Sequence, residues 1–235
     1  MLREEISKGL ELIEQNTTRL WQSANKLDDR EDAQAKRLLV ALAEEEAAKY
    51  LMLLDAVRCP KSSLGKHLDK FYKHLARGIY VKACEWRPAD FAEVKKLVER
   101  ERPGLYLDGP NDVDYIFRNQ IAEQREGTIY VDYVESENRR YWTTPPLSDL
   151  VFATDLESTA IGLVQALNAL GVAHPDALAH VAKVWDLVSI EEKMLWQTLA
   201  EKNAHALDPL RATPGLAPEL QSAHDWVVAR WPYPM

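Results

Sequence analysis

The sequence predicts a mainly α-helical protein with one small β-hairpin, and three observations lead to this fold class. Glycine is scarce, with 9 residues in a chain of 235, whereas alanine and leucine, which cost least in a helix, are frequent. Apolar residues recur at spacings of three and four along most of the chain, as on the buried side of an amphipathic helix. One segment, residues 128–144, instead alternates as strands do. We therefore expect a helical bundle with a hairpin insertion.

The first half of the chain predicts several helices separated by polar or proline-containing breaks. Cys59-Pro60 ends the second helix, because a residue before proline avoids the helical conformation. The third carries one apolar stripe from Leu64 to Trp86, after a cap at Ser62 or Ser63. The predicted helices cover residues 6–27, 31–57, 64–86, 89–102 and 112–124.

The second half predicts the hairpin and four more helices. We predict its strands at residues 128–134 and 139–144, with a turn at 135–138. Further helices are expected at about 149–170, 174–188, 191–207 and 216–230. We expect a helical bundle with its hairpin over residues 1–146 and a helical C-terminal extension over 147–235, packed on the same core.

Composition and motifs exclude several classes of function. The net charge is −8, so a general basic surface for nucleic acid is absent. The chain shows neither a signal peptide nor a membrane span, and two cysteines without a CxxC motif favour a reducing, cytoplasmic setting. Walker A, GxGxxG, GxSxG and HExxH motifs are missing, and no Glu precedes a His by three residues. We predict no cofactor and no metal.

One segment runs against the acidic background. Between Arg58 and Arg87 eight lysines and arginines face only two acidic residues, a local charge of +6 that leaves −14 elsewhere. Such a basic strip is where an anionic partner would dock. The alternative is a solvated helix face, or one that pairs with the acidic remainder.

Two sets of side chains are candidates for a functional site. Glu46 and Lys49 fall on or beside the apolar side of the second helix, where a charge needs a partner. They either stitch helices or a dimer together or form a polar site in a groove. The third helix carries four polar residues that share one face, His67, Lys70, His74 and Arg77.

The four residues on the third helix suit phosphodiester chemistry without a metal. Cleavage of RNA needs a base for the 2′-hydroxyl and an acid for the leaving oxygen, and histidine serves both. Lysine and arginine suit the phosphate. The alternatives are a solvated basic face and, more weakly, a metal-binding bundle that uses His67 and His74 with Glu46.

Three elements in order resemble the AbiV-type abortive-infection family of the HEPN superfamily. Residues 41–51 are similar to its A-x-E-E-x-x-K helix, and residues 71–77 to its His-x-x-basic helix. Residues 125–133, with Arg125 and Tyr130, resemble its R…YVD element. Together they cover roughly residues 8–146.

The resemblance implies a helical bundle that dimerises around a shared polar cleft, and a role against phage through RNA cleavage or a block of translation. His74, Lys70 and Arg77 are then the predicted catalytic residues. The predicted substrate contacts are His67, Lys49, Glu46, Arg125 and Tyr130. The HEPN nuclease signature, Arg followed after four to six residues by His, is absent from this sequence.

Two hypotheses of different classes follow. The first is a phage-defence protein that acts on RNA or the translation machinery, as a metal-independent ribonuclease. The second is a non-catalytic, dimeric helical module that binds a protein partner, such as an inhibitor or a phage protein. The acidic body, the missing nuclease spacing and the unmatched C-terminal helices motivate the second.

Overall fold

The computed structural model describes residues 3–28, 31–101, 121, 129–136, 139–144, 158–186, 188–211 and 218–234. The helices of the first half are α1 (Arg3–Ala24), α2 (Ala33–Asp55), the short 3-10 helix η1 (Lys61–Ser63), α3 (Leu64–Lys70), α4 (His74–Trp86) and α5 (Phe91–Arg100). Those of the second half are α8 (Thr159–Ala169), α9 (Pro175–Trp185), α10 (Trp196–Arg211) and α11 (Pro218–Arg230). The predicted mainly α-helical fold is confirmed. The helix predicted at 112–124 lies outside the described residues.

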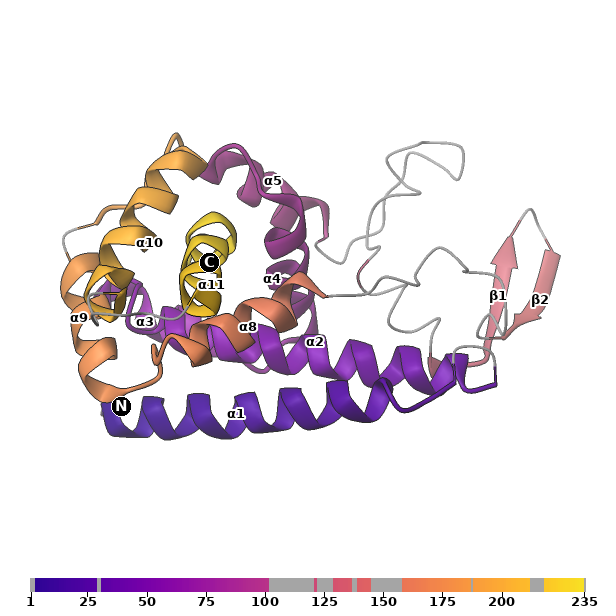
Figure 1. Cartoon of the computed structure of the whole chain (residues 1–235). Helices are drawn as coiled ribbons and strands as arrows, with labels where there is room; N and C mark the ends of the chain where they lie inside the picture. The colour runs from indigo at the N-terminus through magenta and orange to yellow at the C-terminus, as the bar shows by residue number, and fades with distance from the viewer. Residues whose placement is uncertain are drawn as a thin grey trace.

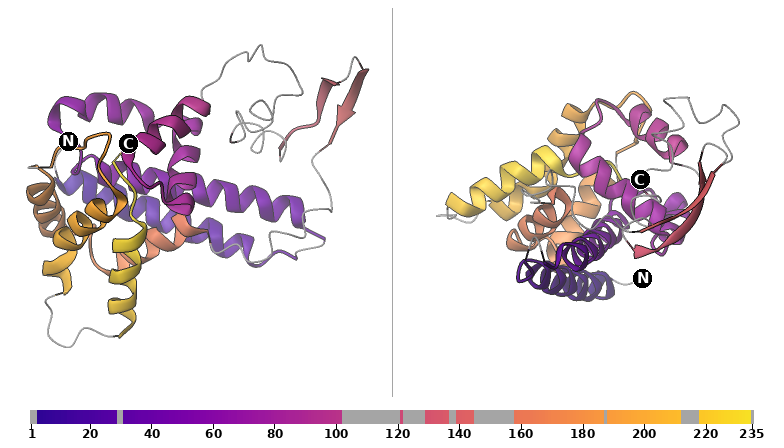
Figure 2. Two further views of the ribbon diagram at one scale, coloured as in Figure 1. Left: turned by 90° about the horizontal axis from the view of Figure 1, so that it is seen from above. Right: turned by 90° about the vertical axis from the view of Figure 1, so that its right-hand side faces the viewer.

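The predicted hairpin is present. Strands β1 (Asp132–Ser136) and β2 (Arg139–Thr143) are antiparallel, and their register pairs Asp132 with Thr143 and Ser136 with Arg139. The first strand begins four residues later than the predicted start at 128, and the second matches the prediction closely. The hairpin stands outside the helical body in Figure 1 and in the left-hand view of Figure 2.

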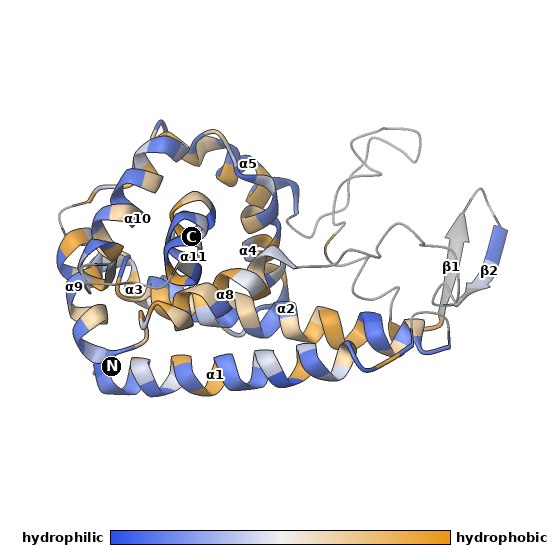
Figure 3. Ribbon diagram, viewed as in Figure 1, coloured by the Kyte–Doolittle hydropathy of each residue, from blue (hydrophilic) through white to orange (hydrophobic). Residues whose placement is uncertain are grey.

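Helices α1 and α2 form a long antiparallel pair along one side of the molecule (Figure 1). Figure 3 shows hydrophobic and hydrophilic residues alternating around the turns of α1, as expected for a helix with one buried side. Its buried positions include Ile6 and Leu10. A Cβ atom on Gly9 would lie 2.8 Å from Leu53 Cδ2, so glycine allows α1 to approach α2 closely.

One hydrophobic core joins the two ends of the chain. Its buried members come from α1, α2 and α4, and equally from α8 to α11 and the segment that follows α11, including Trp231 and Tyr233. Figure 1 shows α11 within the ring of helices that α4, α5, α9 and α10 form. None of the described helices is both long and apolar enough to cross a membrane.

The prediction of one continuous helix over residues 64–86 was wrong. The structure divides it into α3 and α4, and Lys73 between them has an extended backbone with φ −93° and ψ 118°. The Arg77 Nε donates to the carbonyl oxygen of Phe71 at 3.0 Å, which holds the turn. His67 and Lys70 therefore lie on α3, whereas His74 and Arg77 lie on α4.

Arg58, predicted as part of a surface basic strip, is instead buried, with 1% exposure. Its guanidinium lies between two indole rings, 4.4 Å from the Trp185 ring centre and 4.1 Å from that of Trp231. Arg58 Nη1 donates to Asp55 Oδ1 at 2.8 Å, and the Tyr80 hydroxyl donates to Asp55 Oδ2 at 2.8 Å. The charge at position 58 therefore joins helices in the interior and contributes nothing to an external docking surface.

Candidate functional site

The structure brings together a carboxylate, an imidazole and a guanidinium on two packed helices. Glu45 on α2 accepts hydrogen bonds through Oε2 from both partners on α4, at 2.7 Å from His74 Nδ1 and 3.0 Å from Arg77 Nη1. The side chains of Glu45 and Arg77 are 15% and 10% exposed, whereas His74 is 53% exposed. In this Glu45–His74–Arg77 cluster the carboxylate and the guanidinium are thus largely buried, whereas the imidazole reaches solvent.

The local backbone explains how the cluster is positioned. His74 is the first residue of α4, so its ring emerges where the chain turns out of α3. Arg77, one helical turn later, bonds both the carbonyl of Phe71 before the helix and Glu45 on the neighbouring helix. Arg77 therefore fixes the start of α4 against α2, and with it the place of His74.

The contacts of His74 define its chemistry. We assign the hydrogen to Nδ1, because its partner is a carboxylate oxygen that only accepts. The remaining nitrogen, Nε2, has no hydrogen-bond partner among the described residues. In the neutral ring Nε2 accepts a proton, and in the protonated ring it donates one. A carboxylate that holds Nδ1 also stabilises the imidazolium that forms.

Glu46 and Lys49, the predicted pair on α2, form an ion pair with each other. Lys49 Nζ lies 2.7 Å from Glu46 Oε1, and the two side chains are 20% and 18% exposed. The ammonium also lies 5.7 Å from the ring centre of Phe71, whose carbonyl binds Arg77. This pair therefore flanks the turn before His74.

Two of the predicted site residues lie on α3. His67 is 4% exposed, and its Nε2 lies 2.6 Å from the carbonyl oxygen of Met52, so its ring packs in the interior against α2. Lys70 is exposed at the end of α3. Partial burial, together with the charge of Lys73, lowers the pKa of the Lys70 ammonium. Of these two residues, only Lys70 has a side chain exposed for a ligand.

The remaining predicted contacts belong to the segment around the hairpin. Arg125 lies outside the described residues. Tyr130, just before β1, is 52% exposed, and on β2 Tyr141 and Trp142 are 48% and 69% exposed. No group of three or more His, Cys, Asp or Glu side chains that could hold a metal ion occurs in the described part of the chain.

Sequence reasoning missed Glu45 as the partner of His74. Three consecutive glutamates stand at 44–46, and each points in a different direction because successive helical residues are turned by about 100°. Glu45 meets α4 and Glu46 meets Lys49 on its own helix. The only signal was the proximity of this acidic run to the predicted apolar side of the second helix.

Glu44 is the third member of the run and has its own pH dependence. Burial raises its pKa from 4.5 to about 7; the nearby Glu85 carboxylate acts in the same direction and the Ser158 hydroxyl opposes it. The folded state therefore prefers the protonated acid. Stability from this group is complete below pH 4.5 and is lost as the pH rises through about 7.

Glu44→Gln should remove this loss. With one pKa unit equal to about 1.4 kcal/mol, the variant should gain roughly 3 kcal/mol over the wild type at pH 8, or about 6–12 °C in Tm. At pH 4.5 the two proteins should melt within about 2 °C of each other. Thermal unfolding followed by circular dichroism measures both. Glu99→Gln, on the exposed side of α5, is the control, and an equal difference for Glu44→Gln at both pH values would contradict the assignment.

Comparison with known proteins places the chain in a family. No curated protein and no solved structure matches it. The family model for AbiV, a HEPN-type family, matches residues 5–160, which is more than half of the chain and includes α1 to α5, the hairpin and the Glu45–His74–Arg77 cluster. Helices α9 to α11 lie beyond the match. The chain thus belongs to the AbiV family of HEPN-like proteins.

Proposed function

We propose that this chain is a phage-defence protein of the abortive-infection type that acts in the cytoplasm on RNA, alone or within the translation machinery, as a metal-independent ribonuclease. Membership of the AbiV family supports the defence role. The single observation that supports the chemistry is the Glu45–His74 pair, with Nδ1 held at 2.7 Å and half of the ring exposed.

The reaction that suits this pair is transesterification within RNA. His74 Nε2 takes the proton of a ribose 2′-hydroxyl, and the 2′-oxygen attacks the adjacent phosphorus. The bond from phosphorus to the 5′-oxygen breaks, and that oxygen receives a proton from an acid. The products are a 2′,3′-cyclic phosphate and a 5′-hydroxyl end. Glu45 stabilises the imidazolium that forms at His74.

The cations take different roles in this proposal. Arg77 is a positioning residue, since its guanidinium is bonded to Glu45 and to Phe71 and is 10% exposed. Lys70, exposed at the end of α3, is the proposed contact for the phosphate. Lys49 and Glu46 support the turn before His74.

The hairpin segment is the proposed contact for bases. Tyr130, Tyr141 and Trp142 are exposed aromatic side chains on which unpaired bases can stack. Arg139 and Arg140 lie beside them on β2, and Arg125 is proposed to contact phosphate from the same segment. Aromatic rings interleaved with arginines suit a single-stranded RNA better than a duplex.

The reaction needs both a base and an acid, and the described part of one chain offers one exposed histidine paired with Glu45. A homodimer would bring two such histidines together and so complete the site. Two large apolar side chains border that pair, Leu42 on α2 with 39% exposure and Tyr72 before α4 with 78% exposure. We expect size-exclusion chromatography with light scattering to give twice the chain mass of 26.8 kDa. Leu42→Glu with Tyr72→Glu should shift the protein to the monomer. A wild-type monomer at all concentrations would contradict this part of the proposal.

The test of the function is RNA cleavage by the purified protein, with a single-stranded RNA substrate, in the presence and absence of EDTA. Wild-type protein should cleave in both conditions and leave cyclic phosphate ends, and His74→Ala should cleave at least about 100-fold more slowly. The same two chains, expressed in a phage-sensitive host, should differ in protection. Absence of cleavage by the wild type in every condition would overturn the ribonuclease.

The second candidate is a non-catalytic module that binds an inhibitor or a phage protein. The specific observation in its favour concerns Arg77, the only arginine beside His74 among the described residues. Its guanidinium already donates to Glu45 and to the carbonyl oxygen of Phe71, rather than being free to bind a phosphate. A stoichiometric protein partner in a pull-down from the native host, without nucleic acid and without loss on His74→Ala, would favour it over the ribonuclease.

A further inference from the structure

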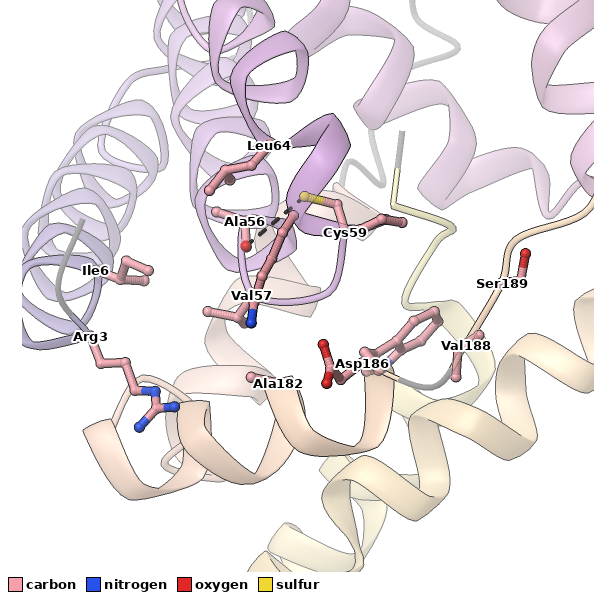
Figure 4. Close-up of a pocket in the computed structure, with 13 residues that line it drawn as sticks. Arg3, Ile6, Ala56, Val57, Cys59, Leu64, Ala182, Asp186, Val188 and Ser189 are labelled. Carbon is pink, nitrogen blue, oxygen red and sulfur yellow. Dashed lines mark hydrogen bonds between the residues drawn. The ribbon is translucent and has the colours of Figure 1, made fainter.

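The structure contains a cavity whose lining differs from the Glu45–His74–Arg77 cluster. Its volume is about 450 Å³, within the usual range for small-molecule sites. Figure 4 shows residues reaching into it from the start of α1, from the segment between α2 and α3, and from the end of α9. None of the three cluster residues lines it.

The walls of this cavity are mainly apolar. Ile6, Val57 and Leu64 form the side made by the first half of the chain, and Trp185 and Val188 form the opposite side. Trp185 is 3% exposed, and the same indole stacks on the buried Arg58. Trp185 thus offers a ligand little surface, whereas Val57, Leu64 and Val188 are only partly buried, so the apolar body of a ligand would lie against these three side chains.

The charges at the cavity are unbalanced. Arg3 and Lys61 contribute two cations and Asp186 one anion, and the lining holds no other charged side chain. Among the described residues, none of these three forms an ion pair, so the net charge of +1 stays available. Burial, followed by the charge of Asp55, raises the pKa of the Cys59 thiol, and this group therefore adds no negative charge at neutral pH.

The position of the cavity supports a binding role. Its residues Arg3 to Leu64 come almost entirely from the part that matches the AbiV model, and Ala182 to Ser189 come from the part beyond it. Small-molecule sites occur, among other places, between the helices of bundles. A ligand here would contact both parts of the chain at once.

We propose that this cavity binds a small organic anion with an apolar body, the anionic group between Arg3 and Lys61 and the body against Val57, Leu64 and Val188. The proposal is independent of the ribonuclease proposal, since it uses other residues. An aromatic acid and a short fatty acid share this chemistry, and the competition experiment below distinguishes them.

The test uses anilinonaphthalene sulfonate, an aromatic anion that fluoresces when it enters an apolar site. The full-length protein should show one saturable site. Phenylnaphthylamine, which lacks the sulfonate, should bind at least about 10-fold more weakly, equivalent to about 1.4 kcal/mol. Naphthoate and decanoate are then added as competitors, and the one that displaces the probe at lower concentration identifies an aromatic or an aliphatic ligand.

Three variants make the test specific. Arg3→Gln with Lys61→Gln should weaken the sulfonate about 10-fold and leave phenylnaphthylamine unchanged. Lys8→Gln with Lys202→Gln, two exposed positions outside the cavity, removes the same charge and should change neither probe. Ala182→Phe fills the cavity and should abolish saturable binding of both probes. Circular dichroism confirms that each variant is folded.

Three results would overturn the proposal. One is the absence of a saturable site in the wild type. Another is equal binding of the two probes. The third is an equal loss in the Arg3 and Lys61 variant and in its Lys8 and Lys202 control, because binding would then reflect the overall charge of the protein. Since the glutamine variants alter only exposed side chains, misfolding of Ala182→Phe would leave the first comparison intact.

Discussion

Replacing Arg58 with alanine is expected to lower the free energy of unfolding by about 3–5 kcal/mol, the usual cost of leaving one member of a buried ion pair unpaired. Arg58 is 1% exposed and Asp55 is fully buried, so water does not replace the lost partner. The change also leaves a void between the rings of Trp185 and Trp231, which now pack on the guanidinium.

The contacts of Arg58 reach across the sequence. Its Nη2 donates to the carbonyl oxygen of Pro232 at 2.8 Å, near the end of the described chain. Asn203 on α10 adds to the same network by donating to the carbonyl oxygen of Trp231 at 2.9 Å. Arg58 therefore ties the part that matches the AbiV model to the helices beyond the match.

Urea unfolding followed by circular dichroism measures the effect, and Tm should fall by roughly 10 °C. Lys96→Ala, at an exposed position on α5, is the control and should stay within about 0.5 kcal/mol of the wild type. Arg58→Met combined with Asp55→Asn should recover part of the loss, because no unpaired charge is then buried. A cost below about 1 kcal/mol for Arg58→Ala would show that the pair does not hold the two parts together.

This network bears on the organisation predicted from the sequence. The division into residues 1–146 and 147–235 stays a prediction, whereas the structure shows one core with members from both parts. A loss of the C-terminal helices would remove both Trp185 and Trp231 and so uncover Arg58. We therefore propose that the two parts fold as one unit, which the single unfolding transition of the wild type would test.

The spacing of apolar residues predicted most helices, because each helix buries one apolar side and the residues of that side recur every three or four positions. The same spacing continues across the break between α3 and α4 and therefore did not predict it. Leu68, Phe71, Leu75 and Ile79 keep the helical spacing through it, without proline or a turn glycine. The break is held by Arg77 bonding the Phe71 carbonyl, a contact that periodicity does not report.

The candidate site was predicted in part for a related reason. His74 and Arg77 were identified because histidine and basic residues suit phosphate chemistry, but their partner Glu45 comes from another helix. Arg58 was predicted in a basic strip and His67 on a polar helix face, because charged and polar side chains usually face water. Only three-dimensional packing shows that Arg58 meets Asp55 and that His67 meets a backbone carbonyl.

The largest effect on activity is expected from His74→Ala, which should reduce RNA cleavage by about 100-fold to 10,000-fold, the usual contribution of general acid–base catalysis. The side chain is half exposed, so its removal leaves a folded protein and the loss falls on the rate. His205→Ala, a histidine with 71% side-chain exposure on α10, is the matched control and should cleave at the wild-type rate.

The Glu45 variant separates a catalytic pair from an isolated histidine. Glu45→Gln keeps the shape of the side chain but removes the charge that stabilises the imidazolium, and we expect a loss of about 10–100-fold. The double variant, Glu45→Gln with His74→Ala, should be no slower than His74→Ala alone, since residues that act as a unit are not additive. Single-turnover cleavage rates measure all three variants. If the two losses instead multiply in the double variant, Glu45 acts through Arg77 and the position of α4, and the carboxylate–imidazole mechanism is wrong.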